Sequence, residues 1–215
     1  MSVILTSTAL VALFVSLAVL LVFVILFILF FPKINKKRYQ KDFVKIYGKK
    51  VYRYALHNDL YLINQLELKG NDDQLLKIDH LLFGNKYIYL ISDYYLPGVV
   101  EAKENDNSFL YTSNEKNAKK VYIDNLLMKN ADLTRRVADN LGLKANLFIP
   151  ISIVDNSCDL LDFKPEAKNN FIVHIASFNK LLDALEARKV APLNDEQLRY
   201  TVKDVNRLNV RRKEI

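Results

Sequence analysis

Residues Lys77–Glu104, KIDHLLFGNKYIYLISDYYLPGVVEAKE, predict the centre of the fold. It contains two apolar runs, Ile78–Phe83 and Tyr87–Ser92, separated by Gly84-Asn85, a dipeptide suited to a tight hairpin turn. A third short run, Val99–Ala102, follows a second turn signal. The pattern predicts three consecutive strands of one sheet, a β-meander.

One residue departs from this apolar pattern. Asp79 lies inside the first run, where an unpaired carboxylate would be costly to bury. The pattern therefore indicates that Asp79 either faces solvent or has a function.

These residues also carry a resemblance. The stretch resembles the core of a NERD (nuclease-related) domain, a branch of the PD-(D/E)XK restriction-endonuclease-like fold. In that family a strand with an Ile-Asp-His motif leads through a short turn into a strand ending Ile-Glu-x-Lys, and a glycine follows four residues after the lysine. Here Ile78-Asp79-His80, Gly84-Asn85, Ile91 and Gly98 fall in register. The resemblance implies an α/β fold with a mixed β-sheet flanked by helices.

The departures from the family fall on its chemistry. The family's Glu position is Ser92 and its Lys position is Tyr94, and a Gly-Glu pair on an earlier helix is replaced by Gly48-Lys49. In the family, an Asp and a Glu hold Mg²⁺ through their oxygens, and the Lys helps to activate water. With Asp79 as the remaining carboxylate, we expect no cofactor and no nuclease activity.

Two alternatives keep a nuclease possible, with Mg²⁺ held at Asp79. Asp93 could supply the second carboxylate, but a shift of one residue along a strand points its side chain to the opposite face unless a bulge intervenes. The sequence Glu101-x-Lys103 has the right residue types, but it follows the Gly98 turn, and alternating charge there is typical of a solvated edge.

The N-terminal part of the chain predicts a membrane anchor. Between Ala9 and Phe31 the only polar side chain is Ser16, and about 23 residues at a rise of 1.5 Å span the hydrocarbon core of a bilayer. Residues 1–8 carry no charged side chain and no small-x-small motif follows Pro32, which argues against a cleaved signal peptide. We expect an uncleaved, single transmembrane helix.

A basic segment follows at once. Residues 33–50 contain eight basic side chains and one acidic side chain, a net charge of +7, whereas residues 51–215 contain 23 of each sign. By the positive-inside rule, this places the N-terminus outside the cell membrane and the C-terminal domain in the cytoplasm. The residues expected at the surface of anionic lipid are Lys33, Lys36, Lys37, Arg38 and Lys41.

The neutral domain gives no support for a nucleic-acid partner from bulk charge. Nucleic-acid binding without cleavage remains an alternative, and it would show a steep salt dependence. Its candidate residues are Lys119, Lys120, Arg135, Arg136, Arg211, Arg212 and Lys213. The main hypothesis is a binding or scaffold module with a protein partner of unknown identity.

The predicted organisation has three parts: residues 1–32 with the anchor, 33–57 as a basic amphipathic helix, and 58–215 as the cytoplasmic domain. In the second part, a helix over about Lys36–His57 should bury one stripe on the sheet. The members of this stripe are Tyr39, Phe43, Tyr47, Val51 and Tyr54.

The remaining elements are predicted from periodicity and turn signals. Strands are expected at Leu60–Leu68, Gln74–Phe83, Asn146–Val154 and Phe171–Ala176, and a short edge strand around Phe109-Leu110-Tyr111. Helices are expected at Lys120–Leu141, at Phe178–Lys189 and from a cap at Asn194, with a polar connection over Asp155–Asn170. One cysteine, Cys158, and three separated histidines, His57, His80 and His174, offer no zinc-ligand spacing.

Overall fold

The computed structural model describes residues 2–70, 74–103, 106–161, 163 and 168–213. The chain divides into two compact units, Met1–Phe43 and Val44–Ile215. The side chains of Lys33, Lys36, Arg212 and Lys213, all named above as candidates, lie outside the described part of the chain.

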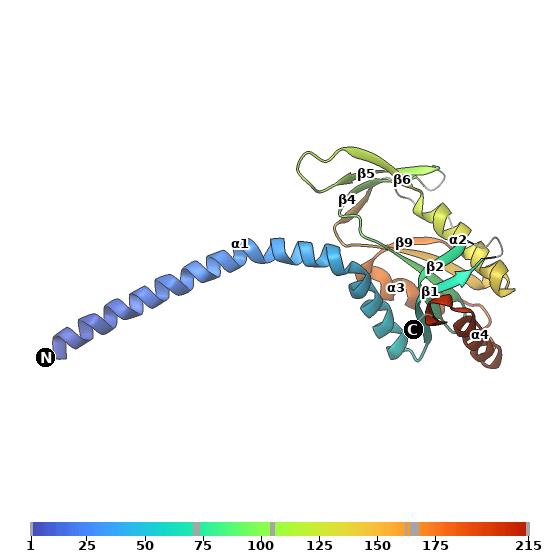
Figure 1. The fold of residues 1–215 in the computed structure, drawn as a ribbon, viewed down its shortest axis with the longest axis horizontal. Helices are drawn as coiled ribbons and strands as arrows, with labels where there is room; N and C mark the ends of the chain where they lie inside the picture. Colours follow the sequence, from blue (N-terminus) through green and yellow to red (C-terminus); the bar gives the residue numbers. More distant parts are fainter. Residues whose placement is uncertain (1, 71–73, 104–105, 162, 164–167, 214–215) are drawn as a thin grey trace. The chain divides into compact units, whose positions relative to one another are not determined.

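Helix α1 covers Ser2–His57 (Figure 1). Its segment Leu10–Ile28 is long and apolar enough to cross a membrane. The Ser16 hydroxyl donates to the Leu13 carbonyl at 2.8 Å, so the one polar side chain of this segment is satisfied within the helix. Length and composition thus agree with the predicted membrane helix.

The last turns of α1, within the second unit, bury three of the five residues of the predicted stripe, whereas Tyr39 and Phe43, in the first unit, are half-buried. Tyr47, Val51 and Tyr54 are all buried. The Tyr54 ring meets the ring of Phe178 edge to face with centroids 6.1 Å apart, and its hydroxyl donates to Asp183 at 2.9 Å. The stripe therefore holds this part of α1 in the core of the domain.

The described strands form two sheets. The first has the order β1-β2-β3-β7-β9. Strands β1, β2 and β3 are antiparallel, whereas β3, β7 and β9 run parallel. Every residue of β7 is buried, as expected for a central strand covered on both faces. The bounds are β1 Tyr61–Lys69, β2 Leu75–Phe83, β3 Ile88–Tyr94, β7 Phe148–Val154 and β9 Phe171–His174.

The predicted hairpin is present, and the predicted meander is wrong. Strands β2 and β3 are joined through Gly84–Tyr87, with the Gly84 N–H donating to the Tyr87 carbonyl at 2.9 Å. The next strand, β4 (Gly98–Glu101), pairs in the second sheet instead. Gly98 permits this pairing, because its φ is +145° and a Cβ there would clash with the Thr112 carbonyl.

The second sheet has the order β6-β5-β4-β8 (Figure 1). Strand β4 is antiparallel to β5 and parallel to β8, so this sheet is mixed as well. The second sheet has a small hydrophobic core of its own, in which Val100, Phe109 and Leu126 are buried. The bounds are β5 Ser108–Ser113, β6 Lys120–Asp124 and β8 Cys158–Leu161.

Two more predictions need correction. The start of the expected helix Lys120–Leu141 is strand β6, because its β-branched and aromatic residues pair with β5. Helix α2 (Leu126–Leu141) begins only after Asn125, whose side chain accepts from the backbone N–H groups of Leu127 and Met128. The expected polar connection Asp155–Asn170 contains β8.

Helices α3 (Phe178–Glu186) and α4 (Asp195–Leu208) lie close to the predicted positions. The side chain of Asn194 caps α4 by accepting from the Gln197 N–H at 3.0 Å, which confirms the predicted start. Short 3₁₀ turns lie at Ala145–Leu147, Ile175–Ser177 and Val210–Lys213. The described part of the domain is a mixed α/β structure with two mixed sheets flanked by helices.

Candidate functional site

The candidate site lies where β2 and β3 run side by side. His80 is opposite Ile91 in the antiparallel register, which brings Asp79 next to the end of β3 that carries Ser92 and Asp93. Successive side chains of a strand point to opposite faces of the sheet. The polar residues of the two strands therefore divide into two groups, one on each face.

The first group contains the positions that the resemblance noted above aligns with the family's Asp, Glu and Lys. The Ser92 hydroxyl is buried and donates to the Asn130 side-chain oxygen of α2 at 2.9 Å. The Asn130 amide in turn donates to Ser152 of β7 at 3.4 Å. Ser92 is therefore part of a buried hydrogen-bond network that joins the sheet to α2.

Tyr94 lies on the same face of the sheet as Asp79 and Ser92. The pKa of Tyr94 is raised to about 12, chiefly by burial and also by the negative charge of Asp79, while the hydrogen bond with Ser92 partly offsets both. The phenol is neutral at physiological pH and cannot replace a lysine ammonium group. Asp79, Ser92 and Tyr94 thus lie on one face of the sheet, and Asp79 is the carboxylate among these three residues.

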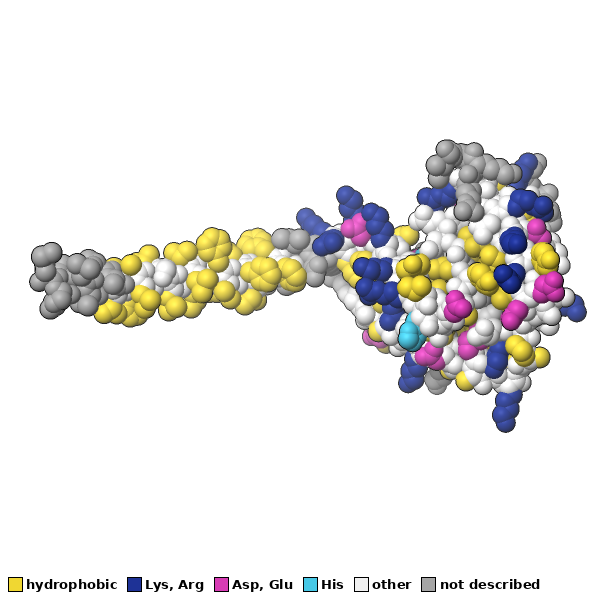
Figure 2. Space-filling model, turned by 90° about the horizontal axis from the view of Figure 1, so that it is seen from below, with side chains coloured by type: hydrophobic (Ala, Val, Ile, Leu, Met, Phe, Trp, Pro, Cys, Tyr) yellow, Lys and Arg dark blue, Asp and Glu magenta, His cyan; other side chains and the backbone are white. Residues whose placement is uncertain are grey.

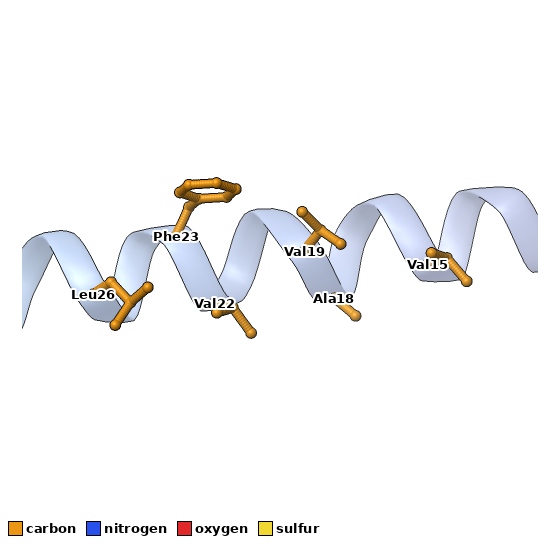
Figure 3. Close-up of a pocket in the computed structure, with 6 residues that line it drawn as sticks. All are labelled: Val15, Ala18, Val19, Val22, Phe23 and Leu26. Atoms are coloured by element: carbon orange, nitrogen blue, oxygen red, sulfur yellow. The ribbon is translucent and has the colours of Figure 1, made fainter.

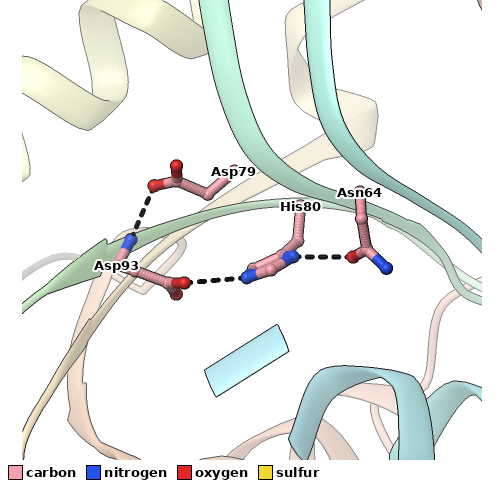
Figure 4. Close-up of polar contacts among 4 residues, drawn as sticks. All are labelled: Asn64, Asp79, His80 and Asp93. Atoms are coloured by element: carbon pink, nitrogen blue, oxygen red, sulfur yellow. Dashed lines mark hydrogen bonds and ion pairs between the residues drawn. The ribbon is translucent and has the colours of Figure 1, made fainter. Parts of the chain in front are cut away.

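The Asp79 carboxylate has a partner within the chain. One of its oxygens accepts the backbone N–H of Asp93 at 2.9 Å (Figure 4). Across from it on β1, Gln65 has φ +51° and is absent from the pairing of β1 with β2. Asp79 therefore lies at an irregular point of the sheet, where its carboxylate binds the backbone at the end of β3.

The second group, on the other face, centres on His80. The residue is 1% exposed, with Nδ1 2.7 Å from the Asn64 side-chain oxygen and Nε2 2.8 Å from an Asp93 carboxylate oxygen (Figure 4). Gly48 of α1 lies against the ring, because a Cβ placed there would be 3.2 Å from His80 Cε1. The histidine is enclosed between β1, β3 and α1.

Burial is the main influence on the pKa of Asp93. Its side chain is 1% exposed, and this burial raises its pKa, while the hydrogen bond and the charge of His80 lower it and the charge of Asp79 raises it. The second carboxylate oxygen of Asp93 has no hydrogen-bond partner among the described residues. Asp93 thus points away from the Ser92 face, as the alternation of a strand predicts.

The other nuclease alternative uses Glu101 and Lys103. Glu101 belongs to β4 in the second sheet, and its carboxylate accepts from Lys120 at 2.7 Å, with both side chains open to solvent. Lys103 is exposed. These residues form a solvated edge on a different sheet from Asp79. Among the described residues, no three His, Cys, Asp or Glu side chains come together to hold a metal ion.

Several of the basic residues considered for nucleic acid have partners nearby. Arg135 pairs with Asp132 at 2.6 Å, and Arg136 donates to Gln74 at 3.1 Å. Lys120 pairs with Glu101, as described above. Lys119 and Arg211 are exposed.

Basic side chains also gather on α1. Lys37, Arg38 and Lys41 are exposed. Figure 2 shows the Lys and Arg side chains clustered beyond the apolar part of this helix. This cluster is the part of the predicted lipid-binding set that the structure describes.

The three hollows described next are lined by none of the four residues Asp79, His80, Ser92 and Asp93. One is on the apolar part of α1 and is lined only by hydrophobic side chains (Figure 3): Val15, Ala18, Val19, Val22, Phe23 and Leu26. Another, of about 420 Å³, has Asp59, Asp195 and Arg199 at its rim. A third, of about 350 Å³, lies beside α4 and includes Leu143 and Tyr200.

Sequence reasoning located the β2–β3 region and missed two of its residues. Asn64 and Asn130 each bind a residue of this region from a distant part of the chain. Neither belongs to a motif, and their roles depend on the pairing of β1 with β2 and on the packing of α2. No local signal in the sequence could have identified them.

Comparison with known proteins adds little. No family model and no curated protein matches the chain. One solved crystal structure, titled as that of a protein of unknown function, AF1548, has 12% sequence identity and a TM-score of 0.36, covering 75% of this chain and 96% of its own. A similarity of this size carries no argument about fold or function.

Proposed function

We propose that this protein is a membrane-anchored, NERD-like domain that acts by binding a protein partner at the cytoplasmic face and does not cleave nucleic acids. The observation that carries the proposal is the composition of the motif positions. Where a restriction-endonuclease-like site needs Asp, Glu and Lys, this chain has Asp79, Ser92 and Tyr94.

The contacts of these three side chains support a loss of catalysis. Mg²⁺ requires several oxygen ligands and a site of negative charge. One Asp79 oxygen accepts the Asp93 N–H, the Ser92 hydroxyl donates to Asn130, and burial keeps the Tyr94 phenol protonated. The face therefore offers one carboxylate and no ammonium group for activating water.

The proposed location rests on the first unit. A segment apolar enough to span a bilayer, Leu10–Ile28, is followed by the basic residues of 33–50. Such an order favours a single-pass protein with its N-terminus outside and its domain in the cytoplasm, next to anionic lipid. Residues 51–215 are neutral overall, which favours a protein partner over nucleic acid.

The experiment is a cleavage assay on the full chain in mild detergent. Single- and double-stranded DNA and RNA are incubated with Mg²⁺ or Mn²⁺, with the Asp79→Ala variant as control. We expect no cleavage by either protein above a protein-free blank. Cleavage by the parent chain that the variant loses would overturn the proposal and place a metal site at Asp79, with Asp93 or Glu101 as its second carboxylate.

A further inference from the structure

Helix α1 has a second face within the domain. Opposite the buried Tyr47 and Tyr54, its exposed side chains follow at three- and four-residue spacing, which places them on one side of the helix. Tyr52 is 52% exposed and Leu56 is 68% exposed. We name as the outward stripe the exposed residues Lys45, Lys49, Tyr52, Arg53 and Leu56.

The composition of the outward stripe differs from that of an ordinary solvated helix. The segment from Phe43 to His57 contains no acidic residue. Helix α4 shows the ordinary case, because its exposed face mixes both signs and pairs Arg207 with Asp204 at 3.1 Å. An aromatic and an aliphatic side chain set among basic ones alone is typical of a helix that lies in a membrane interface.

We infer that the outward stripe lies on the anionic surface of the bilayer, with Tyr52 and Leu56 inserted at the boundary of headgroups and acyl chains. The inference rests on the proposed membrane anchoring. Lipid is the occupant because the apolar segment of the same helix keeps the stripe at high effective concentration beside the bilayer. The surplus positive charge of the chain also lies in residues 33–50, next to and within this stripe.

The sequence contains a residue at which α1 could bend toward the membrane surface. Pro32 lies between the apolar segment and the stripe. A proline inside a helix removes one backbone N–H and is a common site of bending. A bend there would let the apolar segment cross the bilayer while the later turns follow its surface.

The test uses tryptophan as a depth reporter, because the chain contains no tryptophan. Three single variants of the full chain are reconstituted in nanodiscs of phosphatidylcholine and phosphatidylglycerol with acyl-chain-brominated lipid. Phe23→Trp reports the apolar segment and Tyr52→Trp reports the stripe. Tyr122→Trp is the matched control, since Tyr122 is 79% exposed on β6.

We expect strong quenching for Phe23→Trp, about twofold quenching for Tyr52→Trp and none for Tyr122→Trp, as for a side chain inserted about 5–10 Å into the interface. Replacing Lys49 and Arg53 by Glu in the Tyr52→Trp variant, or omitting phosphatidylglycerol, should abolish the quenching of its tryptophan. Leu56→Trp serves as a second reporter of the same stripe.

The outcomes separate the inference from the proposed anchoring. Quenching of Phe23→Trp without quenching of Tyr52→Trp or Leu56→Trp would overturn the inference and leave the anchor intact, with an acidic protein surface as the occupant to examine next. Absence of quenching in Phe23→Trp would overturn the anchoring itself, and the inference with it.

Discussion

Gly48 of α1 lies against the imidazole of His80 on β2, so closely that a Cβ at position 48 would be 3.2 Å from His80 Cε1. The histidine has little freedom to move away, because Asn64 and Asp93 bind its two ring nitrogens. Because Gly48 has no side chain, α1 can pack closely against β2 at this point. The resemblance aligns Gly48-Lys49 with a Gly-Glu pair of the family, and in this structure Gly48 packs against His80.

Substitution of Gly48 tests this contact. Gly48→Ala should be close to neutral, because a helix-propensity gain of about 1 kcal/mol opposes the tight contact. Gly48→Val should destabilise the domain by about 1–3 kcal/mol through overpacking. The measurement is the urea midpoint of the full chain in detergent, with Lys49→Val as the matched control at an exposed position. A Gly48→Val variant as stable as the control would show that α1 is not packed tightly on His80.

Asn130 tests the buried network on the opposite face. Asn130→Ala removes the acceptor of the buried Ser92 hydroxyl and one of the two hydrogen bonds of Ser152, which keeps its bond to the Leu126 carbonyl. We expect a loss of about 1–3 kcal/mol in the free energy of unfolding. The control on the same helix is Asp132→Ala, an exposed partner of Arg135 that should cost less than about 1 kcal/mol. Equal effects of the two variants would contradict the network.

The pH dependence of stability tests Asp93. Burial raises the pKa of Asp93 above its ordinary value of 3.8, so the folded state holds its proton to higher pH than the unfolded state. The resulting stabilisation is complete below pH 3.8 and is lost as the pH rises through the folded pKa. The stability of the parent chain relative to Asp93→Asn should therefore fall as the pH rises from 3.5 to about 7.

Asp124 provides the opposite control. Its hydrogen bond with Lys129 lowers the pKa of this exposed carboxylate. Asp124 therefore contributes to the free energy of unfolding at pH values above its ordinary pKa, and this contribution is lost as the pH falls. The contribution should be small because solvent screens the ion pair. Unfolding midpoints of the parent chain, Asp93→Asn and Asp124→Asn over this pH range give the comparison. Parallel curves for the parent chain and Asp93→Asn would show that Asp93 ionises alike in both states.

Cys158 should be an unreactive thiol. Its pKa is raised to about 12, chiefly by burial and also by the charges of Asp155 and Asp159. Since the thiolate is the reactive species, alkylation by iodoacetamide at pH 8 should be on the order of a hundredfold slower in the folded chain than in urea. A Tyr122→Cys variant in a Cys158→Ser background should react quickly without urea. Equal rates for Cys158 in both conditions would contradict its burial.

Local patterns predicted the elements that depend on near neighbours. The β2–β3 hairpin follows from two apolar runs and a turn, and the start of α4 follows from the cap at Asn194. The buried stripe of α1 follows from helical spacing of Tyr47, Val51 and Tyr54. In each case the residues that determine the structure lie within a few positions of one another.

The rest depends on partners distant in the sequence. Strand β4 looks like a continuation of the meander until β5 and β8 are present to pair with it. Strand β8 itself is short and has exposed residues, so its composition resembles a polar connection. The two faces of the candidate site likewise depend on Asn64 and Asn130, whose positions are set by sheet register and helix packing.

The pairing of the strands also has a consequence for synthesis of the protein. Strand β3 pairs with β7, and β4 pairs with β8, but the whole of β4, β5, β6 and α2 lies between β3 and β7 in the chain. Neither sheet can close until the ribosome has made β7 and β8, and such long-range closure makes folding slow. The apolar segment of α1 is made long before this point. The β2–β3 hairpin must therefore wait with its apolar residues unpaired on one side, which makes this interval the time of greatest risk of aggregation.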